Sequence, residues 1–386
     1  MAENSNNGVP ETADWAEFRR QMPVARRWAY FDHAAVAPLS GPTRTAMQEW
    51  LDDATQNGDA NYLDWIGRVE RLRDNAARMI SATPEEIGLI RNTTEGINLV
   101  AEGFDWQPGD NVVIRADEFP ANQYPWLHLA DRGVETRRVA TEEDGRFDPD
   151  RLAAACDDRT RILSISWVAF ADGWRHDVDR LARIAHDCGA LLLLDAIQGL
   201  GVFPLDVSQT PVDFLAADGH KWMLGPEGAG IFYLRREHLD RLRPTGVGWN
   251  SVVRPHDFSH IELRLKDTAA RYEGGSPNMG GLIGLGASLD LLGRFPVEAI
   301  GRRIVELTDF ACERLQQIGA ILHSDRRPEH KSGIVTFELP GRDPNEARRR
   351  CLERQVVLSC RGGRLRISPH AYNDASDIDR LIEALT

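Results

Sequence analysis

Lysine is scarce in this chain of 386 residues: among its 46 basic residues, only Lys221, Lys266 and Lys331 are lysines. Chemistry that requires a titratable amine therefore has three candidate side chains. Positive charge is scarce as well, because 59 acidic residues give a formal net charge of −13. Nucleic acids and anionic membranes attract clustered basic side chains, so the composition argues against both as the main partner.

Cysteines and long apolar runs are also few. The chain has five cysteines without metal-site spacing: Cys156, Cys188, Cys312, Cys351 and Cys360. A chain of this length needs no disulfide to hold its core, and we predict neither a disulfide framework nor a metal site. The apolar run 190–194 is far too short to cross a bilayer, and the N-terminus lacks the regions of a signal peptide. We therefore predict a cytoplasmic protein.

Short apolar runs alternate with amphipathic ones from about residue 85. The pattern predicts strands at 86–91, 110–115, 161–167, 190–195, 212–216 and 230–234, and helices at 94–103, 123–132 and 177–188. This alternation is typical of an α/β fold in which a mainly parallel sheet lies between helices. In such a fold, ligands bind at the carboxyl ends of the strands.

The pattern changes after Pro277. Helices are predicted at 280–292, 297–318, 345–354 and 375–385, and strands at 332–338, 356–359 and 365–368. We predict a large domain of residues 21–291 and a small α+β C-terminal domain of residues 292–386. The N-terminal segment 1–20 is expected to pack on the small domain.

Lys221 follows the predicted strand 212–216, in the run Asp-Gly-His-Lys-Trp. A lysine at the end of such a strand faces the crevice at the sheet edge. Burial there would lower its pKa and make the amine nucleophilic toward an aldehyde. Taken alone, an ordinary surface lysine is the commoner explanation.

Asp195 ends the apolar strand 190–195, where a buried carboxylate is costly unless a cation meets it. A protonated pyridine nitrogen is such a cation, and the pair would keep the ring an electron sink. Gln198 could then bond the phenolic oxygen of the ring. An N-cap or loop carboxylate is the alternative for Asp195.

Thr93 and Thr94 lie at the start of the predicted helix 94–103. A helix N-terminus offers unpaired N–H groups and the positive end of the helix dipole, so it can hold a phosphate without basic side chains. Plain N-capping is the alternative.

Longer runs around these residues resemble the class V aminotransferase-fold family of pyridoxal 5′-phosphate (PLP) enzymes. This family includes cysteine desulfurases, selenocysteine lyases, isopenicillin-N epimerases and kynureninases. The runs follow the family's order: YFDHAAVAP (30–38), RNTTEGINLV (91–100), EFPANQYPW (118–126), LDAIQG (194–199), FLAADGHKWMLGPEGAG (214–230), RYEGGSPNMGG (271–281) and LRISPHAYN (365–373). The resemblance implies the PLP-dependent transferase fold, fold type I, and PLP as cofactor.

The resemblance also implies roles for the cofactor-binding residues. Lys221 would form the Schiff base with PLP and move the proton at the substrate's α-carbon. Asp195 would pair with the pyridinium nitrogen, and Gln198 with the ring oxygen. The phosphate-binding and ring-covering residues would be Thr93, Thr94, His220 and Phe119.

Substrate binding and assembly follow from the same resemblance. Arg366 would grip the substrate's α-carboxylate, with Arg361 and Arg364 as alternatives. His33 and Ala34 would belong to the substrate-binding set. Ser276 stands where a hydroxyl of the family reaches the phosphate of the partner subunit, which implies a homodimer with shared active sites.

Three positions depart from the desulfurase pattern. Asp218 stands where desulfurases have a serine or threonine; because it would repel a phosphate dianion, we expect it to turn away or to meet an arginine. Phe170 lies in a segment where desulfurases carry an asparagine, which is closer to the epimerase-like branch. Cys360 is the candidate for a mobile thiolate, but no long loop precedes Arg366, and a small residue at a strand end is the better interpretation.

We predict a PLP-dependent enzyme that acts on an α-amino acid, with cysteine desulfurase or C–S lyase-like activity preferred. Isopenicillin-N epimerase-like racemisation or epimerisation comes second and class V transamination third, while kynureninase has only Phe119 in its favour. Two other classes fit less well. A nucleotide-binding oxidoreductase would need a Gly-x-Gly-x-x-Gly run after an early strand. A PLP sensor without turnover would be contradicted by turnover of any amino acid.

Overall fold

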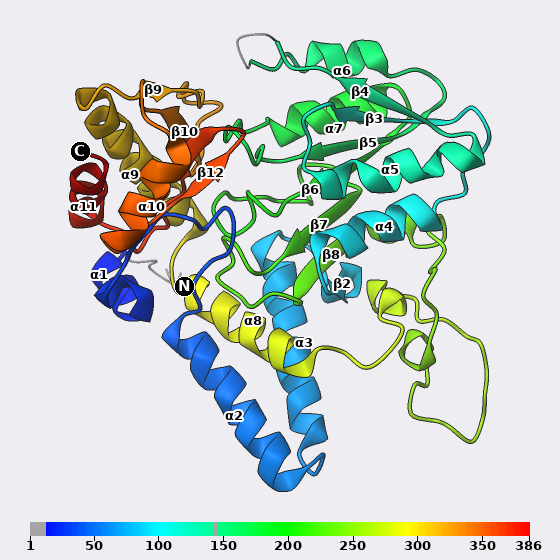
Figure 1. Ribbon diagram of the computed structural model, residues 1–386. Coiled ribbons are helices and arrows are strands. Elements are labelled where there is room, and N and C mark those ends of the chain that lie inside the picture. Colours follow the sequence, from blue (N-terminus) through cyan, green and yellow to red (C-terminus); the bar gives the residue numbers. More distant parts are fainter. Residues whose placement is uncertain (1–12, 143–145) are drawn as a thin grey trace, which may run out of the picture.

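The computed structural model describes residues 13–142 and 146–386 (Figure 1). Its largest sheet has the strand order β2-β8-β7-β6-β5-β3-β4. The strands are β2 (Ile87–Ile90), β3 (Asn111–Arg115), β4 (Glu135–Val139), β5 (Thr160–Ser166), β6 (Leu191–Asp195), β7 (Phe214–Asp218) and β8 (Gly230–Leu234). β8 runs antiparallel to β2 and β7, and the other neighbouring pairs are parallel. The predicted mainly parallel α/β sheet is therefore confirmed.

Both faces of this sheet are buried. Along β6, Leu192 and Leu194 enter one hydrophobic cluster, whereas Leu191 and Leu193 enter another. The helices on the two faces are α4 (Thr93–Gly103), α5 (Tyr124–His128), α6 (Asp150–Ala155) and α7 (Val178–Asp187). Burial on both faces explains why the β6 sequence is continuously apolar instead of alternating.

Helix α4 begins at Thr93, one residue before the predicted start. Asn92 caps it, since its Oδ1 accepts a hydrogen bond from the Glu95 N–H at 2.9 Å. The helix packs closely on the sheet, because a Cβ added to Gly96 would lie 2.6 Å from the Cβ of Ala216 in β7. This contact brings the first turn of α4 to the carboxyl end of β7.

Three long helices pack together beside the sheet, at the bottom of Figure 1. They are α2 (Gly41–Asn57), α3 (Tyr62–Met79) and α8 (Met279–Leu292). Close approach of α2 and α8 requires a small residue, since a Cβ at Gly284 would lie 2.8 Å from the Met47 side chain. The sequence pattern predicted α8 but neither α2 nor α3.

The C-terminal residues form a second, antiparallel sheet of order β12-β13-β10-β9. Its strands and the helices around it are α9 (Val297–Gln317), β9 (Ile321–Leu322), β10 (Val335–Glu338), α10 (Pro344–Glu353), β12 (Ser359–Arg361), β13 (Arg364–Ile367) and α11 (Ala375–Leu385). The pattern predicted α11 with the same bounds. Within the described residues, no helix combines the length and apolar character needed to span a bilayer.

N-terminal residues contact this C-terminal part. Strand β1 (Ala29–Tyr30) pairs in parallel with β11 (Val356–Val357). In helix α1 (Trp15–Arg20), Arg19 donates a hydrogen bond to Asp377 of α11 at 2.7 Å. Residues 1–12 of the predicted segment 1–20 lie outside the described residues, and the division at residues 20 and 291 stays a prediction.

Candidate active site

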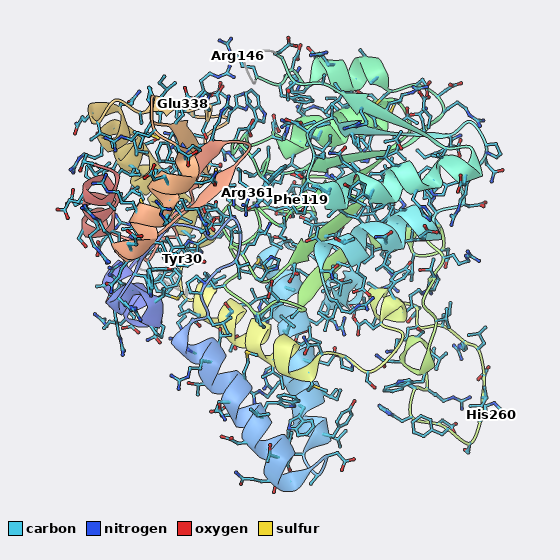
Figure 2. All side chains as sticks on the ribbon, in the orientation of Figure 1. Tyr30, Phe119, Arg146, His260, Glu338 and Arg361 are labelled. Carbon is cyan, nitrogen blue, oxygen red and sulfur yellow. The ribbon has the colours of Figure 1, made fainter. Side chains whose placement is uncertain are left out.

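A cavity of about 360 Å³ lies where the carboxyl ends of β5, β6 and β7 face the C-terminal strands. The predicted site residues that line it are Ala34, Thr93, Thr94, Phe119, Asp195, Gln198, His220, Lys221 and Arg366. Figure 2 labels two residues of the lining, Phe119 from the segment after β3 and Arg361 from β12. His33 and Ser276 do not belong to the lining.

Lys221 reaches the cavity from the turn that follows β7. The backbone of this turn is fixed, because the His220 carbonyl accepts the Ala37 N–H at 2.7 Å and the Lys221 carbonyl accepts the Leu224 N–H at 3.0 Å. Burial lowers the pKa of Lys221 to about 8, although Asp195 opposes the shift. A substantial fraction of the amine is therefore neutral, and nucleophilic, just above neutral pH.

Asp195 is the last residue of β6 and lies between Ser166 and Ala216 on the neighbouring strands. Its Oδ1 accepts the Ile197 N–H at 3.1 Å. Burial raises its pKa to about 6, and Lys221 is the cation that partly offsets this rise. Among the described residues no basic side chain forms an ion pair with Asp195, so the carboxylate can accept a cationic group of a ligand in the cavity.

Two polar side chains of the cavity wall, Thr93 and Gln198, are tied to neighbouring segments by hydrogen bonds. The Thr93 hydroxyl accepts the Asp218 N–H at 3.0 Å, which ties α4 to β7. Gln198 donates to the Ala34 carbonyl at 3.0 Å and accepts from the Trp222 indole N–H at 2.8 Å. The Gln198 amide is thus held in one orientation with one N–H hydrogen left over.

Phe119 stands over the mouth of the cavity and is 44% exposed. Its ring makes an edge-to-face contact with Phe170, with ring centroids 5.2 Å apart. The Lys221 Nζ lies 5.7 Å from the Phe119 ring centroid. An aromatic ring in this position can cover a planar ligand that reaches Lys221.

Asp218 corrects an expectation from the sequence. It meets no arginine in the described residues; its Oδ2 lies 2.9 Å from the Nδ1 of His220. Asp218 is the last residue of β7 and its side chain is 5% exposed in the cavity wall. The reason is local: a strand end directs the carboxylate inward, and the histidine two residues later is the nearest basic group.

Arg366 is almost fully buried and already has protein partners. It donates to the Phe170 carbonyl at 2.6 Å and to Ser359 Oγ at 3.2 Å, and it lies 3.4 Å from Asp32 Oδ1. Burial lowers its pKa to about 10. Arg361 lines the same cavity, and in the described part of the chain it forms no ion pair with a carboxylate.

The structure places two predicted residues away from this cavity. His33 is fully buried behind it, with Nδ1 bonded to the Ser368 carbonyl and Nε2 bonded to the Tyr372 hydroxyl, both at 2.8 Å. Both ring nitrogens are occupied, so His33 has no nitrogen free to contact a substrate. This corrects the sequence-based interpretation. Ser276 is exposed and lines a larger cavity of about 1100 Å³, which shares Thr94 with the first.

Sequence reasoning assigned no role to Glu118, the residue before Phe119. Its carboxylate accepts the Ser166 N–H at 2.8 Å and the Ser166 hydroxyl, and so attaches the Phe119 segment to the end of β5. Burial raises the pKa of Glu118 to about 7. The sequence signal that could have indicated a role for Glu118 was its charge, since the rest of the run 118–126 is uncharged.

No thiol lines the cavity in the described part of the chain. Cys360 is partly buried on β12, where it pairs with Leu365 across the ladder to β13. A cysteine held in a strand pair differs from a mobile nucleophile on a long loop. The interpretation of Cys360 as a small strand residue is therefore retained.

The fold and the cavity define an α/β enzyme of fold type I. A family model described as Aminotransferase class-V matches residues 29–381. A probable cysteine desulfurase of Methanothermobacter thermautotrophicus is 33% identical over 391 residues, which cover 96% of each chain. A cysteine desulfurase of Pectobacterium atrosepticum is 35% identical over 70% of this chain and 67% of its own length.

Solved structures agree with the family model. The apo cysteine desulfurase of Thermococcus onnurineus superimposes with a TM-score of 0.87 at 26% identity over 96% of both chains. The cystine C-S lyase C-DES, solved with its product cysteine persulfide, has a TM-score of 0.89 at 23% identity over 95% of this chain and 99% of its own, which shows the shared fold. This chain belongs to the aminotransferase class-V family of PLP-dependent enzymes, so the predicted family and fold class are confirmed.

Proposed function

We propose that this chain binds PLP through Lys221 and breaks the C–S bond of a sulfur-containing α-amino acid, as a cysteine desulfurase or C–S lyase. The observation that carries the proposal is the buried pair of Lys221 and Asp195 in one cavity. Lys221 has a pKa lowered to about 8, and no basic side chain of the described residues forms an ion pair with Asp195. When bound, PLP supplies an electron sink for the bonds at the substrate's α-carbon.

The cavity residues fit this cofactor by charge and position. Asp195 would pair with the pyridinium nitrogen, and the leftover N–H of Gln198 would meet the ring oxygen. Thr93, Thr94 and His220 would surround the phosphate at the start of α4, where the helix dipole favours an anion. Phe119 would cover the ring from the open side.

Lys221 would accept the proton that leaves the substrate's α-carbon. Its lowered pKa supports this role, because a general base works best when its pKa is near the working pH. Arg366 would hold the α-carboxylate, with Arg361 as the second guanidinium in the cavity. Asp32, now 3.4 Å from Arg366, would keep that guanidinium in place.

Elimination fits the site better than sulfur transfer to a protein thiol, because no cysteine of the described residues lines the cavity. In this reaction the Cα–H proton goes to Lys221, the Cβ–S bond breaks, and its electron pair leaves on sulfur. Arg361 favours cystine or another substrate with a second carboxylate, since no carboxylate of the described residues pairs with it. Epimerisation and transamination remain the alternatives.

The test combines absorbance and products. Wild-type protein with PLP is expected to show the visible absorbance band of lysine-bound cofactor. The Lys221→Ala variant is expected to lack this band, and its turnover should fall by at least about 1000-fold. Borohydride reduction should attach PLP to Lys221 and leave Lys266 and Lys331 unmodified by peptide mass mapping. Lys331→Ala is the matched control, because Lys331 is engaged with Asp309 at 2.6 Å.

Product analysis separates the reactions. Sulfide and pyruvate from L-cysteine, or cysteine persulfide and pyruvate from L-cystine, would support elimination. D-amino acid from L-alanine would instead identify an epimerase. A wild type that stays colourless with PLP contradicts the whole proposal.

We also propose a cytoplasmic homodimer whose Ser276 reaches the phosphate site of the partner. The supporting feature is the segment 252–263, which projects from the molecule near the labelled His260 in Figure 2. It exposes Phe258 by 73%, Ile261 by 89% and Leu263 by 77%. Exposed apolar groups of this kind mark an interaction surface. Light scattering should give twice the chain mass of 43.2 kDa. Mixing Lys221→Ala with Ser276→Ala subunits should create dimers with one intact site, which bind PLP more tightly than Ser276→Ala dimers.

A further inference from the structure

Asp218 brings a negative charge to the place where the proposed function puts a phosphate. Its backbone N–H is bonded to Thr93 Oγ1 at 3.0 Å, so the residue is fixed against the first turn of α4. Its side chain is 5% exposed and lines the same cavity as Thr93 and Thr94. A carboxylate and a phosphate dianion side by side in a buried site repel each other strongly.

The partner of Asp218 leaves its hydrogen bonds incomplete. Asp218 Oδ2 lies 2.9 Å from His220 Nδ1, within ion-pair distance, but the two groups are not aligned for a hydrogen bond. Asp218 Oδ1 and His220 Nδ1 are both buried without a hydrogen-bond partner. The His220 backbone cannot move away, because its carbonyl is bonded to Ala37. Buried polar atoms are rarely left unpaired, so this pair offers unused hydrogen-bonding groups to a ligand in the cavity.

The surrounding charges do not neutralise Asp218. Asp195 on β6 adds a second carboxylate to the cavity, and Lys221 interacts electrostatically with both carboxylates. Arg366 on β13 is occupied by Phe170, Ser359 and Asp32. Arg361 on β12 forms no ion pair with Asp218 in the described part of the chain. Because no neighbouring cation neutralises Asp218, a proton on the Asp218–His220 pair is the way to remove its repulsion of a bound phosphate.

We infer that the Asp218–His220 pair takes up one proton when the phosphate group of the cofactor binds, and so becomes a hydrogen-bond donor to that phosphate. Asp218 is then a positioning residue of the phosphate site. The inference rests on the proposed function, since the ligand is PLP. One proton taken up makes phosphate binding weaken as pH rises, by up to tenfold in Kd per pH unit.

Pyridoxine 5′-phosphate is the probe, because it has the ring and phosphate of PLP but no aldehyde to react with Lys221. Calorimetric titration of the apo-protein in buffers of different ionisation enthalpy, at pH 6.5 to 8.5, counts the protons taken up. Wild type should take up about one proton more with this probe than with pyridoxine, which lacks the phosphate. Asp218→Ser, the hydroxyl that the resemblance places here, and His220→Gln should each reduce this difference toward zero.

Two outcomes overturn the inference while the proposed function stands. One is a wild type that shows the visible PLP band but takes up no extra proton with pyridoxine 5′-phosphate. The other is an Asp218→Ser variant that binds the probe more tightly than wild type with an unchanged proton count, since Asp218 would then merely repel the phosphate. A wild type that binds neither PLP nor the probe contradicts both. Melting curves should be recorded for both variants to check that they are folded.

Discussion

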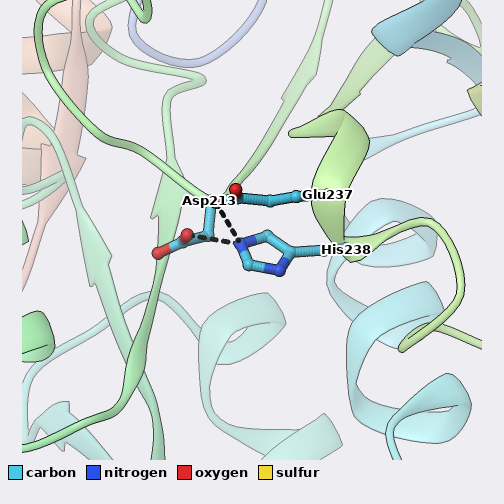
Figure 3. Close-up of side chains that lie close together, drawn as sticks. All are labelled: Asp213, Glu237 and His238. Atoms are coloured by element: carbon cyan, nitrogen blue, oxygen red, sulfur yellow. Dashed lines mark hydrogen bonds and ion pairs between the residues drawn. The ribbon is translucent and has the colours of Figure 1, made fainter.

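The two ends of strand β7 carry two aspartates with opposite surroundings. Asp213, just before the strand, accepts a hydrogen bond from His238 Nε2 at 2.6 Å (Figure 3). It also accepts hydrogen bonds from His186 Nε2 at 2.8 Å and from the Leu192 N–H at 2.7 Å. Asp218, at the other end, has one buried oxygen without a partner. The protein satisfies the first carboxylate, whereas the described residues leave one oxygen of the second without a hydrogen bond.

The difference extends to protonation. The histidines hold the pKa of Asp213 below its ordinary value despite burial. Asp195 and Glu118, at the carboxyl end of the same sheet, have pKa values raised by burial to about 6 and about 7. Carboxylates at one edge of the sheet stabilise the fold, while those at the other edge cost stability that a bound cofactor can recover.

The largest effect is expected for Asp213→Ala, which should lower the free energy of unfolding by roughly 3 kcal/mol because two histidines and an amide lose their acceptor. A lowered pKa means that Asp213 stabilises the fold above its ordinary pKa and loses this effect as pH falls through its folded pKa. The difference in free energy of unfolding between wild type and Asp213→Ala should therefore shrink toward acid pH. Urea unfolding curves between pH 3 and pH 7 measure this difference. PLP affinity should stay within twofold.

Glu237→Gln is the matched control for this prediction, since Glu237 lies 3.7 Å from His238 Nε2 but is 69% exposed. It should change stability by less than about 0.5 kcal/mol. Equal losses for both variants would contradict the distinction between the two ends of β7.

An effect of similar size and opposite sign is expected for Asp195→Asn in the apo-protein. A carboxyl whose pKa rises to about 6 on folding costs stability as pH rises from about 4 to 6, on the order of 3 kcal/mol above that range. The asparagine variant should melt at the same temperature as wild type at pH 4 and higher at pH 8. It should also bind PLP more weakly, and a lower melting temperature at pH 8 would refute the prediction.

The smallest effect is expected for Phe119→Leu. Loss of the aromatic face and of the edge contact with Phe170 should raise the Kd of PLP about threefold to tenfold, with little change in apo-protein stability because Phe119 is 44% exposed. Fluorescence titration with PLP measures this change. Leu127→Ala, another exposed apolar residue, is the control and should leave the Kd unchanged.

Elements with a clear hydrophobic pattern could be predicted from the sequence. Strand β8 has the predicted bounds because Gly230–Leu234 is an apolar run buried on both faces. Helix α2 was missed because only Thr43 and Ala46 among its residues are fully buried, so its pattern has little periodicity. Strand β7 lies two residues later than predicted, which makes Asp218 a strand residue.

The candidate site was predictable where it depends on strand ends. Lys221 and Asp195 each follow or end a buried strand, and the cavity brings them together. Contacts between distant segments were not predictable: nothing near Arg366 in sequence indicates that Phe170 and Asp32 occupy its guanidinium. The same is true of His33, whose partners lie more than 300 residues away.

The guanidinium of Arg366 joins three segments of the chain through Phe170, Ser359 and Asp32. A substrate carboxylate that reaches it must compete with contacts that already exist. An amine without a carboxylate cannot replace these contacts, so Arg366 would keep its bonds to the three segments. If Arg366 holds the α-carboxylate as proposed, selection of amino acids over simple amines would be built into the resting arrangement as an energetic threshold, which the substrate itself would have to overcome.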